Sequence, residues 1–112
     1  MNSNSTDLEY LSGVFKVLSD PTRLKLFSML LGGVHCNCEL VSLTGLSNNL
    51  ISHHMHVLIE AGLINSRRKP DDARWILYSV DREKLDQLQS VLALFINPIK
   101  LTEREVVCPP CS

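Results

Sequence analysis

The sequence of 112 residues lacks any apolar run approaching the roughly 20 residues that a membrane-spanning helix needs. Residues 1–7 contain neither a basic segment nor an apolar one, so we expect no signal peptide. No Gly-rich phosphate loop, Ser/His/Asp set or pair of carboxylates stands out, and we therefore do not expect an enzyme. These absences predict a cytoplasmic protein whose cysteines are reduced.

Positive charge is also not in excess, because 11 Lys and Arg residues stand against 12 Asp and Glu residues. The formal net charge of −1 does not by itself indicate a nucleic-acid binder. The basic residues are nevertheless clustered in one short segment, which contains Arg67, Arg68, Lys69 and Arg74. A local patch of this kind can contact phosphates even when the whole chain is almost neutral.

The apolar content predicts a single folded domain. Hydrophobic residues make up 45% of the chain, as in ordinary globular proteins. We expect a disordered N-terminus over residues 1–6, a folded domain over residues 7–97 and a C-terminal tail over residues 98–112. A domain of this size has a modest core and often gains stability from dimerisation.

Hydrophobic periodicity divides the domain into helices and strands. Apolar spacing, N-cap residues and helix-ending Gly or Pro residues predict five helices, over residues 7–19, 21–31, 39–43, 48–61 and 82–96. Residues 63–69 and 74–80 are extended candidates joined by a turn, which predicts a β-hairpin with the basic cluster near its tip. The expected fold class is mainly α with a small β-hairpin, arranged as a winged helix-turn-helix.

The predicted fourth helix has two different faces. Its inward face is expected to contain Leu50, His54, Val57, Leu58 and Ala61. Its outward face can hydrogen-bond, and a short helix with a polar front suits the major groove of DNA. We therefore predict that this helix contacts double-stranded DNA through Ser47, Asn48, Asn49, Ser52, His53 and His56, and the hairpin through Arg67, Arg68, Lys69 and Arg74.

The predicted fifth helix is more apolar than packing against one small core requires. Its apolar stripe contains Leu85, Leu88, Val91, Leu92 and Phe95, and is widened by Leu94 and Ile96. We expect this surface, together with that of the first helix, to form the interface of a homodimer. No membrane partner is expected.

Three segments resemble motifs of the ArsR/SmtB family of bacterial metal-responsive repressors. Residues 18–24, with the sequence LSDPTRL, look like a motif at the start of the family's DNA-binding region, and residues 52–64 resemble its recognition segment. Residues 34–40, with the sequence VHCNCEL, are similar to the Cys-x-Cys-Asp-Leu motif of members that sense arsenic, cadmium or lead. The resemblance implies a homodimer that represses its own operon from an inverted-repeat operator and leaves that DNA when an ion binds.

The sequence departs from the family patterns at the ion site. Arsenic-sensing members have a third cysteine at the position of Val41, and cadmium- and lead-sensing members have N-terminal cysteines, whereas none precedes Cys36 here. The family's alternative site on the last helix uses His ligands, and residues 82–97 contain no histidine. The resemblance therefore implies an ion site at Cys36 and Cys38 that needs further ligands.

The tail contains two candidates for those ligands. Cys36 and Cys38 lie at the start of the predicted third helix, whose N-terminus favours thiolate over thiol. Cys108 and Cys111 flank two prolines that pre-shape a turn, and the tail is long enough to reach the third helix of either subunit. We hypothesise that these four cysteines bind a soft metal(loid) ion. Three thiolates suit As(III) or Sb(III), four suit Cd(II) or Zn(II), and Pb(II) is also compatible.

Other functions remain open at the level of the sequence. A regulator of the same fold could sense oxidants or sulfide if these cysteines formed disulfides or persulfides. Zinc bound by the thiols could be purely structural. A thiol–disulfide oxidoreductase using Cys108 and Cys111 is least favoured, because such a motif should open a helix in a thioredoxin-like fold and here it lies at the end of the sequence.

Overall fold

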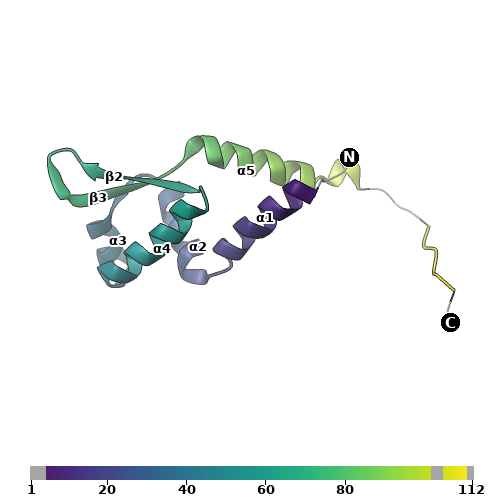
Figure 1. Ribbon diagram of the computed structural model, residues 1–112, viewed down its shortest axis with the longest axis horizontal. Coiled ribbons are helices and arrows are strands. Elements are labelled where there is room, and N and C mark those ends of the chain that lie inside the picture. The colour runs from purple at the N-terminus through teal and green to yellow at the C-terminus, as the bar shows by residue number, and fades with distance from the viewer. Residues whose placement is uncertain (1–4, 102–104, 111–112) are drawn as a thin grey trace.

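The computed structural model describes residues 5–101 and 105–110 and, within them, five α-helices and one antiparallel sheet (Figure 1). The helices are α1 (Ser5–Leu18), α2 (Pro21–Leu31), α3 (Asn37–Thr44), α4 (Asn48–Glu60) and α5 (Arg82–Phe95). The strands are β1 (His35–Cys36), β2 (Ile64–Lys69) and β3 (Asp72–Val80), and a short 3-10 helix, η1, spans Pro98–Lys100. This order confirms the predicted winged helix-turn-helix, with α3 and α4 as the helix-turn-helix and β2–β3 as the wing.

Side-chain caps define the starts of α2 and α4. The Asp20 carboxylate accepts two backbone N–H groups from the first turn of α2, at 2.9 and 3.1 Å. Ser47 Oγ accepts the backbone N–H of Leu50 at 3.1 Å. These acceptors satisfy backbone donors that a helix leaves unpaired at its N-terminus. The predicted starts of both helices are therefore confirmed.

Two other helix starts differ from the predictions. The helix α1 begins at Ser5, two residues before the predicted start at residue 7, while residues 1–4 lie outside the described part of the chain. The helix α3 begins two residues early because Cys36 caps it. Cys36 Sγ accepts the Cys38 N–H at 3.4 Å, and Glu39 Oε1 accepts the Cys36 N–H at 2.9 Å. This capping box uses a sulfur where Ser or Thr is usual, so the sequence did not indicate it.

The predicted inward face of α4 is partly wrong. Leu50 is 40% exposed, whereas Ile51 and Met55 are fully buried. Together with His54 and Leu58, these two residues form a buried stripe at the spacing i, i+3, i+4, i+7. Leu50 is rotated by about 100° from Ile51 around the helix axis and falls outside this stripe.

The strand β1 joins the start of α3 to the wing. The sheet has the order β1-β3-β2, and β1 pairs with β3 through His35 opposite Tyr78 and Cys36 opposite Leu77. A strand of two residues is too short to show periodicity, and the sequence analysis missed it. Its pairing places the first thiol of the candidate site directly beside the wing.

The helices α1 and α5 lie side by side at the end of the molecule away from the wing (Figure 1). Of the α5 residues only Leu88 is buried. Large apolar side chains remain exposed on both helices: Leu8, Phe15, Leu94 and Phe95. No helix in the described ranges combines the length and apolarity needed to cross a membrane.

Candidate DNA-binding surface and thiol site

The polar residues predicted on the outward face of α4 are gathered there by the structure. All six are exposed: Ser47, Asn48, Asn49, Ser52, His53 and His56. His56 Nε2 lies 3.2 Å from Glu60 Oε1, one turn further along the same face. Ser52 hydrogen-bonds to the hydroxyl of Tyr78, whose pKa is raised mainly by burial. The recognition helix thus presents a continuous hydrogen-bonding face and is tied to β3 by Ser52.

The four basic residues of the wing are exposed, but three of them have partners within the hairpin. Arg74 pairs with Asp72 at 2.7 Å, and its hydrogen bonds hold the pKa of Asp72 below its usual range. Arg68 Nη1 donates to the Ala73 carbonyl at 2.8 Å. Lys69 Nζ lies 3.8 Å from an Asp71 oxygen, while Arg67 has no ion pair in the described ranges. Two aspartates therefore offset part of the wing's positive charge.

The Cys36 and Cys38 sulfurs are adjacent, with their Sγ atoms 2.7 Å apart. Cys36 is buried and Cys38 is exposed, so one sulfur of the pair faces solvent. Cys38 opens onto a shallow hollow of about 290 Å³ that Glu39, Ser42 and Leu43 also line. The hydrogen bond with Cys36 raises the pKa of the Cys38 thiol, which opposes the expected effect of the helix N-terminus. The pair is accessible from one side and consists of neighbouring thiols.

The structure does not bring the tail thiols to this pair. Cys108 is exposed, and residues 105–110, among which it lies, are beyond α5 and at the opposite end of the molecule from α3 (Figure 1). Cys111 lies outside the described residues. Within residues 5–101 and 105–110, no three His, Cys, Asp or Glu side chains are grouped closely enough to hold a metal ion. In this arrangement the described part of the chain brings two thiols together, those of Cys36 and Cys38.

Asn37, which lies between the two cysteines, was not singled out by the sequence analysis. It is only 7% exposed, and it hydrogen-bonds to three different parts of the protein. Its Oδ1 accepts the backbone N–H of Ile76 at 3.2 Å and the thiol of Cys36 at 3.3 Å, and its Nδ2 donates to Asn48 Oδ1 at 3.3 Å. The one signal in the sequence that could have indicated Asn37 is that a polar residue lies between the two cysteines of a Cys-x-Cys motif.

His54 has a structural role rather than a ligand role. Its ring is buried, and burial lowers its pKa. Arg23 Nη1 lies 3.5 Å from His54 Nδ1, and since a guanidinium can only donate, Nδ1 is the unprotonated nitrogen. Arg23 also donates from Nε to the Val17 carbonyl at 2.9 Å. These bonds join α1, α2 and α4, and they confirm that His54 is a hydrogen-bonded core histidine.

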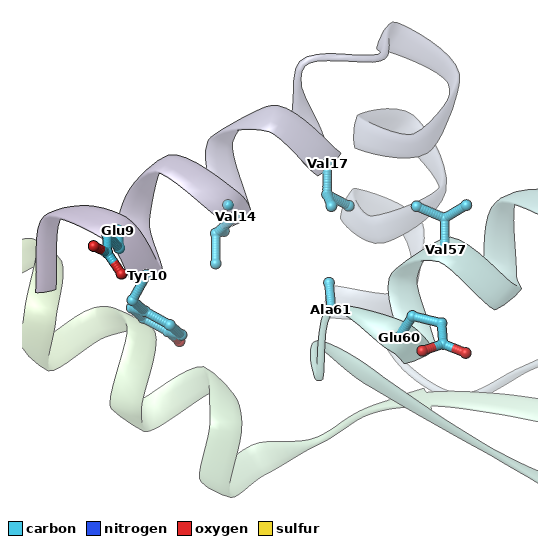
Figure 2. Close-up of a pocket in the computed structure, with 8 residues that line it drawn as sticks. Glu9, Tyr10, Val14, Val17, Val57, Glu60 and Ala61 are labelled. Atoms are coloured by element: carbon cyan, nitrogen blue, oxygen red, sulfur yellow. The ribbon is translucent and has the colours of Figure 1, made fainter. Parts of the chain in front are cut away.

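A second hollow lies between α1 and the C-terminal end of α4 (Figure 2). Its volume is about 390 Å³, and its wall is mostly apolar, with Val14 and Val17 opposite Val57 and Ala61. Its two acidic lining residues are Glu9 and Glu60. None of the lining residues is a cysteine or histidine, so this hollow has no soft ligand for a metal(loid) ion.

Comparison with known proteins gives a consistent assignment. Residues 20–66 match the family described as "Bacterial regulatory protein, arsR family". The "Arsenical resistance operon repressor" of Staphylococcus xylosus is 34% identical over 82 residues, which cover 73% of this chain and 76% of that protein. The "HTH-type transcriptional regulator YgaV" of Escherichia coli (strain K12) is 34% identical over 102 residues, covering 90% and 89%.

A solved structure agrees with these sequence matches. The crystal structure of a "Possible transcriptional regulator for arsenical resistance" superposes with a TM-score of 0.61 at 32% identity, covering 72% of this chain and 81% of that chain. The described fold, with its recognition helix and wing, is that of a DNA-binding transcriptional regulator and not of an enzyme. The chain therefore belongs to the ArsR family of bacterial regulatory proteins.

Proposed function

We propose that this regulator is a homodimeric repressor that releases an inverted-repeat operator when a soft metal(loid) ion binds Cys36 and Cys38. The observation that supports it most is the position of the thiol pair. The two sulfurs are 2.7 Å apart at the first turn of α3, the helix that precedes the recognition helix in the helix-turn-helix. An ion bound there acts directly on the DNA-binding unit.

The DNA contacts that we propose follow from the exposed face of α4 and from the wing. The outward residues of α4 lie in the major groove, where their amide, hydroxyl and imidazole groups reach base edges: Ser47, Asn48, Asn49, Ser52, His53 and His56. The wing contacts phosphates through Arg67, Arg68, Lys69 and Arg74. Arg67 lacks an ion pair within the described ranges, so it can contact a phosphate without first leaving an aspartate.

The exposed apolar surface supports a homodimer. Leu94 and Ile96 are 62% and 63% exposed at the end of α5, and Leu8 and Phe15 are exposed on the adjacent α1. An apolar surface of this kind gains stability when a second copy covers it. A two-fold dimer then presents two recognition helices to the two halves of an inverted repeat.

The thiol pair provides two ligands, and we propose that the tail supplies the others. The twelve residues from Asn97 to Cys108 can span about 40 Å when extended, whereas α5 is about 21 Å long. Chain length therefore permits the tail to turn back past the start of α5, and we propose that Cys108 and Cys111 reach the α3 of their own subunit or of the partner. Three thiolates give an As(III) or Sb(III) site, and four give a Cd(II), Pb(II) or Zn(II) site.

Arsenite is the first ion to test, because the relative in Staphylococcus xylosus is described as an arsenical resistance operon repressor. Each Cys–SH that binds arsenite replaces one hydroxide on the arsenic. The thiol proton leaves with that hydroxide as one water molecule, so the step is balanced. The protein's own part is to hold Cys36 and Cys38 side by side, so little chain entropy is lost on binding.

The same pair supports one alternative, a redox-sensing repressor. Adjacent sulfurs can lose two protons and two electrons to an oxidant and form a disulfide. Such a regulator responds to oxidant without any ion and is reset by reductant, which distinguishes it from an ion sensor.

The test is fluorescence anisotropy of a DNA duplex from upstream of the gene, with fully reduced protein at a stated salt concentration. Arsenite, antimonite, Cd(II), Pb(II) and Zn(II) are titrated separately. We expect one ion to weaken DNA binding about 5- to 150-fold, the usual range of allosteric coupling. Cys36→Ser and Cys38→Ser abolish this response, while Cys108→Ser and Cys111→Ser weaken it. Specific DNA binding that no ion alters would overturn the proposal.

A further inference from the structure

Asn37 places a buried amide where the thiol pair, the recognition helix and the wing meet. Its orientation is fixed by chemistry, because the Ile76 backbone N–H can only donate and must face the amide oxygen. The Nδ2 group then faces Asn48, the first residue of α4, with its 3.3 Å contact to Asn48 Oδ1. The remaining neighbour is the Cys36 thiol, which donates to the same Oδ1 at 3.3 Å.

The Cys36 thiol can make its bond to Asn37 only while it carries its hydrogen. Ligation replaces the S–H bond by a bond from sulfur to the ion, and the amide oxygen then faces an electron-rich sulfur with no donor between them. The amide regains a favourable contact by turning its Nδ2 group toward the sulfur. That turn removes the acceptor from the Ile76 N–H and the donor from Asn48, because both bonds need the original orientation.

We propose that Asn37 is the positioning residue that couples the thiol pair to the DNA-binding surface. While Cys36 is a thiol, the Asn37 amide holds the start of α4 and the wing strand β3 in the arrangement that binds DNA. When Cys36 is ligated, the amide turns and releases both elements. This inference rests on the proposed function and adds the residue through which it operates.

The first experiment compares the full-length wild-type protein with Asn37→Ala, Asn37→Asp and the control Asn65→Ala. Asn65 is an exposed asparagine on β2, at the surface of the wing. Operator affinity is measured by anisotropy with and without saturating arsenite, and arsenite affinity is measured separately by the near-ultraviolet absorption of the thiolates. Thermal unfolding followed by circular dichroism shows that each variant is folded.

We expect Asn37→Ala to bind DNA about as weakly as the arsenite-bound wild-type protein and to change less than about twofold when arsenite is added. By linkage, the same variant binds arsenite more tightly than wild type, because no amide bonds have to be broken. A merely structural defect does not tighten ion binding. Asn37→Asp keeps an acceptor for the Ile76 N–H but has no Nδ2 group to turn toward the sulfur, so we expect it to stay on DNA when arsenite is added. Asn65→Ala behaves as wild type.

The outcomes separate the two proposals. A wild-type protein that stays on DNA in saturating arsenite contradicts the proposed function. A wild-type protein that leaves DNA, together with an Asn37→Ala variant that leaves it by the same factor, overturns the role of Asn37 and keeps the proposed function.

A second measurement needs no variant. Amide hydrogen exchange of the wild-type protein, followed by NMR, reports directly on the Ile76 N–H. We expect arsenite to accelerate its exchange at least tenfold while the buried amides of α4 stay protected. An Ile76 exchange rate that arsenite leaves unchanged overturns the inference.

Discussion

The two ends of the molecule are built differently. Where α3, α4 and the wing meet, Leu40 and Ile51 are fully buried and the buried amide of Asn37 makes three hydrogen bonds. Where α1 and α5 lie side by side, Leu94 and Ile96 are more than half exposed (Figure 1). The first end has a core that is buried within one chain, although single apolar side chains such as Leu43 stay exposed, whereas at the second end several exposed apolar side chains lie on two adjacent helices. We expect substitutions at the first end to affect stability and DNA binding, and substitutions at the second end to affect the proposed assembly.

The largest effect on stability is expected at the first end, where α3, α4 and the wing meet. Leu40→Ala removes a fully buried side chain of α3 and should lower the free energy of unfolding by about 2–5 kcal/mol. Leu43→Ala, on the same helix but 63% exposed, is the matched control and should cost less than about 0.5 kcal/mol. Urea unfolding followed by circular dichroism measures both. Equal losses would show that α3 is not anchored as described.

The opposite end should control assembly instead. The double substitution Leu94→Asp with Ile96→Asp places charge on the exposed apolar surface and should convert a dimer into monomers in sedimentation velocity. Operator affinity should fall about 100-fold or more, because two half-sites are no longer bound by one linked pair. Leu24→Asp, at a residue 49% exposed on α2, is the control and should leave the assembly unchanged. A double variant that sediments as wild type would rule out this interface.

A smaller effect is expected at the wing, where Asp72 pairs with Arg74. Asp72→Asn frees this guanidinium for a phosphate and should tighten DNA binding. The slope of log affinity against log salt should become more negative by about 0.9, the value for one added phosphate contact. Asp86→Asn frees Arg82 on α5, away from the wing, and should change neither quantity. An unchanged slope for Asp72→Asn would show that Arg74 does not reach DNA.

The smallest effect is a pH dependence that comes from His54. Burial lowers its pKa in the folded protein, with Asp20 opposing this shift and Arg23 and His53 adding to it. As pH falls below about 6.5, the unfolded chain binds a proton that the folded protein resists, so stability decreases. Urea unfolding between pH 7.5 and 5 should show this decrease, and His54→Gln should reduce it. An equal decrease in both proteins would assign it to other groups.

The elements that were predicted well from the sequence are those whose ends are set by side chains close by in the chain. Asp20 and Ser47 cap their helices through side chains that this position favours, so α2 and α4 begin as expected. The winged helix-turn-helix follows from the order of such elements. The inward face of α4 was misassigned at Leu50, because apolar spacing alone does not distinguish two stripes that differ by one residue.

The candidate site was predicted less completely, because its connections are between distant parts of the chain. The sulfur cap of Cys36 and the two-residue strand β1 have no periodic signal. The bond from Ile76 to Asn37 spans 39 positions in the sequence, and only folding reveals it. The roles of Cys108 and Cys111 depend on where the tail goes when an ion is present, and they remain proposals.

The most direct test of the central proposal follows ion binding and DNA release in the same sample. Arsenite is titrated into the reduced full-length protein on fluorescent operator DNA, while thiolate absorption and anisotropy are recorded together. The proposal predicts that absorption rises and anisotropy falls in parallel, with both ending at one ion per thiol site. Absorption that saturates while the protein stays on its DNA would contradict it.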